Sequence, residues 1–260
     1  MAIRVGILTS GGDCPGLNAT LRGVAKALYH RMGDKVEIVG IMNGYDGLIN
    51  GNFREMSPDE FSGILTVGGT ILGTKRTPFK MMRVVGDDKV DKVAAMKKTY
   101  KDAKLDCLLC LGGNGTHKTA NLLSQEGLNI IGLPKTIDND IKFIPQSFGF
   151  ETAVYKATEA IECAHTEARG MPNGIGLVKL MGRESGFIAA QATLAMKEVN
   201  FVLVPEAPFT LEGEGGLLPA LEERLKSRHH AVIVAAEGAG QHLLDRSGAT
   251  DASGNLLLGD

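Results

Sequence analysis

The sequence predicts an α/β protein with two doubly wound, Rossmann-like lobes and mostly parallel sheets. Three observations predict it: short apolar runs alternate with longer segments of helical periodicity, glycine-rich turns follow several runs, and the alternation starts afresh near residue 150. The 260 residues are enough for one large or two modest α/β domains. We therefore expect two lobes, residues 1–150 and 151–260, with ligands bound at the carboxyl ends of the strands in a cleft between them.

Each element follows from the spacing of its apolar residues. On residues 16–30, for example, Leu17, Leu21, Val24 and Leu28 fall on one helical face. In the first lobe the pattern predicts strand 3–9, helix 16–30, strand 36–42, helix 87–100, strand 105–111, helix 116–126 and strand 129–133. In the second lobe it predicts helix 151–169, strand 175–181, helix 186–196, strand 201–204, helix 213–228 and strand 231–236.

Composition excludes several classes of function. The net charge of −2 leaves no broad basic field for a nucleic-acid backbone. The first residues enter a strand pattern without a secretory signal, and no window approaches ~18 uninterrupted apolar residues. We therefore expect neither nucleic acid nor membrane as a partner, and the cytoplasm as the compartment. Cys107 and Cys110 have CxxC spacing but fall in an expected buried strand, so we interpret them as packing residues.

Two glycine-rich loops lie between an expected strand and an expected helix. They are residues 10–18 (SGGDCPGLN) and 112–116 (GGNGT), and neither fits the GxGxxG or GxxxxGK[ST] spacing. Main-chain N–H groups and a helix N-terminus could hold a phosphate there, and Asn114 and Thr116 could present oxygens to a metal or phosphate. A simple turn capped by Asp13 is the alternative, but two such loops in one lobe favour ligand binding.

The segment 134–140 (PKTIDND) carries two carboxylates two residues apart. If it is extended, Asp138 and Asp140 face the same side. One could accept a proton from an attacking hydroxyl while the other assists a metal or orients water. Lys135 and Thr136 add a cation and a hydroxyl. An acidic turn that caps a helix fits equally well, so the segment alone favours neither interpretation.

The segment 181–185 (MGRES) and two later carboxylates are further candidates. Gly182 would bring the backbone close to a ligand, and Arg183 could bind phosphate or carboxylate in bidentate fashion, or form a surface ion pair instead. Glu206 and Glu237 each follow an apolar strand, where they could bind sugar hydroxyls or cap a helix.

Basic and histidine residues near the glycine loops are less specific. Lys75 and Arg76, in GTKRTP, could contact nucleotide phosphates or be solvated. His117 follows the second glycine loop, where packing at the start of a helix is favoured over ligand contact. The sequence has no histidine spacing typical of a metal site and no Ser, His and Asp set for nucleophilic catalysis.

Together these motifs resemble those of the phosphofructokinases. SGGDCPGLN, GGNGT, PKTIDND and MGRESG occur in the order and approximate spacing of that family, over nearly all 260 residues. The run GIGLVKLMGRESGF is most similar to the plant and protist-like, ATP-using branch. The resemblance implies a 6-phosphofructokinase of glycolysis that transfers the γ-phosphate of ATP to the 1-hydroxyl of fructose 6-phosphate, giving fructose 1,6-bisphosphate and ADP. It also implies Mg²⁺ and a homo-oligomer, tetramer or dimer.

The resemblance further implies roles for individual residues, with residues 1–150 binding the donor and residues 151–260 the sugar phosphate. Asp138 would take the hydroxyl proton. The implied catalytic residues are Lys135, Thr136, Asp138, Asp140 and Arg183. The implied donor-binding residues are Gly11, Arg76, Thr77, Gly113, Asn114, Gly115 and Thr116. The implied sugar phosphate-binding residues are Thr136, Ile137, Asp138, Met181, Gly182, Arg183 and Glu237.

Three features leave alternatives open. Gly115 stands where pyrophosphate-using relatives carry Asp, which favours ATP, whereas Lys135 is shared with pyrophosphate users and supports a pyrophosphate-dependent enzyme as the alternative. Asn114, the expected metal ligand, stands where the family usually has Asp, so metal affinity should be lower. Family members continue past residue 260, so we expect the sugar-phosphate lobe to be C-terminally incomplete. A catalytically weak regulatory or binding subunit is therefore the third hypothesis.

Overall fold

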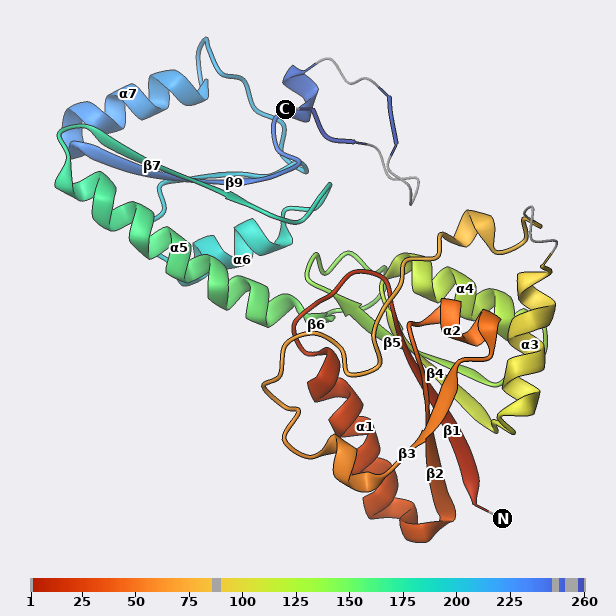
Figure 1. The fold of residues 1–260 in the computed structure, drawn as a ribbon. Coiled ribbons are helices and arrows are strands. Elements are labelled where there is room, and N and C mark those ends of the chain that lie inside the picture. Colours follow the sequence, from red (N-terminus) through yellow and green to blue (C-terminus); the bar gives the residue numbers. More distant parts are fainter. Residues whose placement is uncertain (1, 86–89, 245–247, 251–256, 260) are drawn as a thin grey trace. The chain divides into compact units, whose positions relative to one another are not determined.

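The computed structural model describes residues 2–85, 90–244, 248–250 and 257–259 and divides the chain into two compact units (Figure 1). The first consists mainly of the residues up to 136 together with 147–149, and the second of residues 137–146 and most of those from 150 onward. The chain passes from one unit to the other after residues 136, 146 and 149, close to the boundary expected near residue 150. The PKTIDND segment is divided between the units after Thr136.

The first unit is built on a six-stranded sheet of order β3-β2-β1-β4-β5-β6. All neighbouring strands are parallel except β2 and β3. Strands β1 and β4 are buried along most of their length, as continuous apolar runs covered on both faces should be. The strands are β1 (Ile3–Ser10), β2 (Val36–Ile41), β3 (Phe53–Met56), β4 (Cys107–Gly112), β5 (Ile130–Thr136) and β6 (Phe148–Gly149).

Helices cover this sheet on both faces. The helices are α1 (Leu17–Met32), α2 (Tyr45–Asn50), α3 (Lys92–Asp102) and α4 (Asn114–Gln125), with the 3-10 turns η1 (Gly33–Lys35), η2 (Pro58–Phe61) and η3 (Phe79–Met81). Figure 1 shows α1 on one face and α2, α3 and α4 on the other. Since β1–α1–β2 runs to one side of β1 and β4–α4–β5 to the opposite side, the topological switch point lies between β1 and β4.

The expected elements of this unit are present, each within three residues of its expected bounds except for one helix that begins five residues later. The short elements α2, β3 and β6 were not expected from the sequence. The helix expected over 87–100 begins at Lys92, where the Asp91 side chain accepts a hydrogen bond of 3.0 Å from the Ala94 N–H. Residues 87–89 of the expected helix lie outside the described residues.

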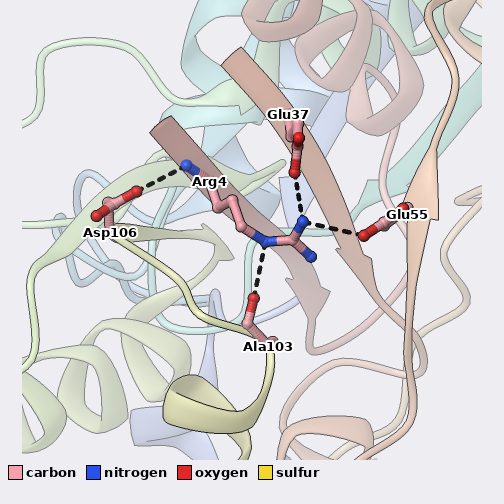
Figure 2. Close-up of polar contacts among 5 residues, drawn as sticks. All are labelled: Arg4, Glu37, Glu55, Ala103 and Asp106. Carbon is pink, nitrogen blue, oxygen red and sulfur yellow. Dashed lines mark hydrogen bonds and ion pairs between the residues drawn. The ribbon is translucent and has the colours of Figure 1, made fainter. Parts of the chain in front are cut away.

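Arg4 connects three strands and a turn near the amino end of β1 (Figure 2). Its Nη1 contacts the carboxylates of Glu37 on β2 and Glu55 on β3, the latter at 2.9 Å. Its Nε donates to the carbonyl of Ala103 at 3.0 Å, and its main-chain N–H donates to Asp106 at 2.8 Å. Burial opposes the charged form, but the two carboxylates raise the pKa of Arg4 overall.

The second unit has a three-stranded parallel sheet of order β7-β9-β8. Its strands are β7 (Gly174–Leu180), β8 (Phe201–Leu203) and β9 (His230–Ala236), and its helices are α5 (Phe150–Gly170), α6 (Phe187–Ala195) and α7 (Leu217–Arg228), followed by the turn η4 (Gln241–Leu243). Helices α5 and α6 pack against one set of β9 side chains and α7 against the other set. The helix expected from residue 213 begins at Leu217, because Gly213 and Gly215 adopt φ of 83° and 77°.

Among the described residues, no helix has both the length and the apolar character that a membrane crossing requires.

Candidate functional site

The two glycine loops meet at the switch point of the first unit. Ser10, at the end of β1, is the register partner of Gly112 at the end of β4. A Cβ atom at Gly112 would lie 2.3 Å from Oγ1 of Thr116 and 2.7 Å from the carbonyl oxygen of Ser10. Thr116 is buried and its hydroxyl donates to that carbonyl at 3.2 Å. Glycine is therefore required at position 112 for the loops to approach so closely.

The next two carbonyls lie in the loop that follows β1, here called the β1 loop, and they are also hydrogen-bonded to side chains. The Thr74 hydroxyl donates to the Gly11 carbonyl at 2.6 Å, and Nζ of Lys135 donates to the Gly12 carbonyl at 2.6 Å. Lys135 is only 5% exposed, so its ammonium lies beneath the loop rather than on the surface. The fold thus places Lys135, an expected catalytic residue, close to Gly11, an expected donor-binding residue, since a Cβ atom at Gly11 would be 3.8 Å from Nζ of Lys135.

Asn18, in the first turn of α1, holds the segment that leads to Arg76. It is 2% exposed. Its Nδ2 donates to the carbonyls of Val67 and Gly69, and its Oδ1 accepts from the Ile71 N–H at 2.9 Å. Both ends of the amide are therefore used to fix one segment against α1.

The basic pair in this segment separates. Nζ of Lys75 forms an ion pair with Oδ1 of Asp46 at 2.7 Å. Arg76 is exposed, and its guanidinium lies against the β1 loop, since a Cβ atom at Gly12 would be 3.1 Å from Nη2. Thr77 follows it in a half-buried position. Of the pair, Arg76 is the cation available to a ligand at the loop.

The start of α4 presents the remaining donor-site candidates of the first unit. Gly113 is the residue before the first turn, and Asn114 and Gly115 are exposed within it. A Cβ atom at Gly115 would have no heavy atom within 4 Å, so the space beside it is open in this unit. Thr116 differs from these neighbours because its hydroxyl donates inward to Ser10.

The residues at this loop fit Mg²⁺ only as a lightly coordinated ion. No group of three or more His, Cys, Asp or Glu side chains that could hold a metal exists among the described residues. Mg²⁺ commonly keeps several waters and takes one or two protein oxygens together with phosphate oxygens. The exposed amide of Asn114 can supply one neutral oxygen to such an ion, with less attraction than a carboxylate.

Asp138 and Asp140 lie in the second unit, in a chain that bends between them. Asn139 has φ of 55°, so the segment is not extended and the argument that placed both carboxylates on one side does not hold. Asp138 is half-buried and Asp140 is exposed. The Ser185 hydroxyl contacts the carbonyl of Asp138 at 3.2 Å and that of Gly182 at 2.8 Å. This contact brings the acidic segment and the MGRES turn together.

Glu237 shapes the MGRES turn directly. Its Oε1 accepts from the N–H groups of Gly182 at 3.0 Å and Arg183 at 2.6 Å. Arg183 has φ of 54°, and a Cβ atom at Gly238 would lie 2.0 Å from the Arg183 carbonyl oxygen. The exposed Met181 precedes this turn. The strand end thus holds the turn by main-chain contacts and leaves the side chain of Arg183 exposed.

Two residues with open interpretations have structural contacts. Oε1 of Glu206 accepts from the N–H of Gly186, the residue before α6, at 2.8 Å, which is the helix-capping alternative. The ring of His117 packs on Gly132, since a Cβ atom there would be 2.6 Å from Nδ1. Burial lowers the pKa of His117, which favours the neutral imidazole.

Sequence reasoning missed three residues that build these loops: Asn18, Thr74 and Ser185. Each lies inside a quoted motif and carries a short hydrogen-bonding side chain, which is the only signal that could have identified them.

Comparisons with known proteins identify the family. The family model described as phosphofructokinase matches residues 4–255. The chain is 49% identical over 237 residues to the ATP-dependent 6-phosphofructokinase of Spirochaeta thermophila, covering 90% of this chain and 63% of the relative. It is 44% identical over 263 residues to ATP-dependent 6-phosphofructokinase 7 of Arabidopsis thaliana, covering 98% of this chain and 52% of the relative. The chain therefore spans less than two thirds of the length of these relatives.

Solved structures agree with the fold. The phosphofructokinase from Saccharomyces cerevisiae matches with a TM-score of 0.79 at 25% identity, covering 91% of this chain and 34% of that one. The pyrophosphate-dependent phosphofructokinase from Marinobacter aquaeolei matches with a TM-score of 0.71 at 22% identity, covering 91% of this chain and 61% of that one. The expected α/β fold class is confirmed.

Proposed function

We propose, since this chain belongs to the phosphofructokinase family, that it transfers the γ-phosphate of ATP to the 1-hydroxyl of fructose 6-phosphate, giving fructose 1,6-bisphosphate and ADP. The observation that carries the proposal is the meeting of two glycine loops at the switch point between β1 and β4, with Arg76 against one of them. Parallel sheets bind phosphate-bearing ligands at this place. The ATP-dependent 6-phosphofructokinases among the relatives, 40 to 49% identical, support ATP as the donor.

On the donor side, main-chain groups and one cation hold the phosphates. Gly11 and the loop that starts at Gly113 offer N–H groups, and the guanidinium of Arg76 neutralises phosphate charge. Thr77 and Gly115 complete the donor contacts, whereas Thr116 acts by holding the two loops together. When bound, Mg²⁺ offsets negative charge on the donor phosphates, with Asn114 as its protein ligand.

On the acceptor side, Asp138 is the proposed general base. As the 1-hydroxyl oxygen forms its bond to the γ-phosphorus, its proton passes to the Asp138 carboxylate and the bond to ADP breaks. Thr136 and Asp140 flank the acceptor, with Ile137 and Lys135 in the same segment. The guanidinium of Arg183 binds the 6-phosphate. Met181, Gly182 and Glu237 complete the expected contacts with the sugar phosphate.

Two alternatives make different predictions. Lys135 is a buried cation beneath the β1 loop, which suits a compact anion such as pyrophosphate as the donor. Turnover with ATP and none with pyrophosphate excludes that alternative. A regulatory or binding subunit would bind both ligands without normal turnover. We further propose, on the family resemblance, a homo-oligomer (tetramer or dimer) in the cytoplasm.

Replacement of Asp138 by Asn tests the assignment of the base. We expect kcat with ATP and fructose 6-phosphate to fall about 10²–10⁴-fold, the usual contribution of a general base, with sugar-phosphate binding retained by calorimetry. Asp102→Asn, at an exposed ion pair on α3, is the matched control and should keep full turnover. Undiminished turnover of Asp138→Asn contradicts the assignment, and a wild-type chain that binds both substrates without turnover supports the regulatory alternative.

A further inference from the structure

Three successive carbonyl groups, at the end of β1 and in the loop that follows it, accept hydrogen bonds from side chains that come from different parts of the first unit. The donors are Thr116 of α4 to Ser10, Thr74 of the segment after β3 to Gly11, and Lys135 of β5 to Gly12. In a trans peptide the C=O and the following N–H point in opposite directions, and no cis peptide bond occurs among the described residues. Anchoring the carbonyls therefore sets the directions of the amides that follow them.

The Gly11 and Gly12 carbonyls control the amides of Gly12 and Asp13. The Gly11 carbonyl points to the Thr74 hydroxyl and the Gly12 carbonyl points to the buried ammonium of Lys135, so the N–H groups of Gly12 and Asp13 point away from these two side chains. Successive N–H groups that point the same way form an anion-binding concavity. The guanidinium of Arg76, which lies against Gly12, adds a cation beside them.

Lys135 is suited to this task in a way that a surface lysine is not. A buried ammonium is costly unless it donates hydrogen bonds, and its 2.6 Å bond to the Gly12 carbonyl is one of them. The bond therefore holds the loop against a charged group that also makes the local potential positive. Both effects favour a phosphate on the outer side of the loop.

We propose that Thr74 and Lys135 are positioning residues, which hold the β1 loop by its carbonyls so that the amides of Gly12 and Asp13 bind a phosphate group of the donor. The identity of that donor rests on the proposed function. A direct contact between Lys135 and the donor would leave Thr74 unimportant. Positioning requires both residues, and their effects are less than additive because they hold one loop.

The test measures binding of inorganic pyrophosphate, without magnesium or sugar phosphate, to the 260-residue chain by the amide resonances of Gly12 and Asp13. In the wild type these resonances shift and saturate. We expect the Kd to rise about fivefold in Thr74→Val and about tenfold in Lys135→Met, the scale of one neutral and one charge-assisted hydrogen bond. The Kd of the double variant should rise by less than the product of the two single fold-changes. Thr74→Ser, which keeps the hydroxyl, should bind pyrophosphate like the wild type.

Two control variants match the chemical changes elsewhere. Lys75→Met removes the same charge from the ion pair with Asp46, and Thr158→Val removes an exposed hydroxyl on α5. Both should leave the Kd unchanged. If Lys135→Met does not fold, the proposal is decided by comparing the pyrophosphate Kd of Thr74→Val with that of Thr74→Ser.

Three results would overturn the proposal: no shift of the two amides in the wild type, weakening by Lys135→Met without weakening by Thr74→Val, or equal weakening in the controls. Turnover of ATP and fructose 6-phosphate is measured separately on the wild type. If the wild type shows no turnover but both variants bind pyrophosphate more weakly, the proposed function is refuted and the positioning role is supported. If the wild type turns over normally but both variants bind pyrophosphate as tightly as the wild type, the positioning role is refuted and the proposed function is supported.

Discussion

Cys110 on β4 should make the stability of the first unit fall at alkaline pH. Its side chain is fully buried, and burial raises the pKa of the thiol to about 12, from an ordinary value of 9.0. Between these values the unfolded chain releases a proton that the folded chain keeps, so stability is full below pH 9 and falls as pH rises toward 12. At pH 10, one unit above the ordinary pKa of the thiol, the expected loss in the free energy of unfolding is about 1.4 kcal/mol.

Cys110→Ala removes this contribution and tests its size. The free energy of unfolding in urea is measured at pH 7.5 and pH 10 for the wild type and the variant. We expect the free energy of unfolding of the wild type to fall by about 1.4 kcal/mol more than that of the variant over this interval. The cavity left by the sulfur lowers the variant's stability equally at both pH values and does not affect this difference. Cys163→Ala, at an exposed cysteine, should keep the wild-type pH dependence. Equal losses in wild type and Cys110→Ala would refute the reasoning.

Two further predictions concern the loops and the sheet. Gly112→Ala should lower stability by about 1–3 kcal/mol, because its methyl group collides with Thr116. Gly115→Ala, where the space is open, is the control for stability, and equal melting temperatures of the two variants would contradict the steric argument. Arg4→Met should lower the free energy of unfolding by about 1 kcal/mol in dilute buffer, since the carboxylate partners of Arg4 are half-exposed or more. This loss should be smaller in 1 M salt. A double-mutant cycle with Glu37→Gln that shows no coupling would contradict the ion pair.

The sequence predicted the strands and long helices because their signal is local. The apolar runs of β1 and β4 and the periodicity of α1 need no tertiary information. The short elements α2 and β3 were missed because six and four residues carry too little periodicity. The start of α7 was placed too early because left-handed conformations at Gly213 and Gly215 cannot be read from helical spacing alone.

The candidate site residues were chosen from sequence motifs, whereas the contacts between them were not predicted. Lys135 and Gly11 come from two separate motifs, and the bond from Lys135 to Gly12 joins residues 123 positions apart. Such a pairing depends on the order and register of β1, β4 and β5, which no local pattern encodes. The same holds for Thr116, whose hydroxyl was expected to face a ligand and instead donates to Ser10.

Asn18 makes the segment that leads to Arg76 sensitive to deamidation. Its Nδ2 faces two carbonyl oxygens, and its Oδ1 faces an N–H. Deamidation would replace that nitrogen by a carboxylate oxygen, so two attractive contacts would become repulsive while the third would remain. The segment leading to Arg76 would lose its attachment to α1 through the exchange of one functional group. Because the new carboxylate would also be buried, deamidation would lower the stability of the first unit as well as the attachment of this segment.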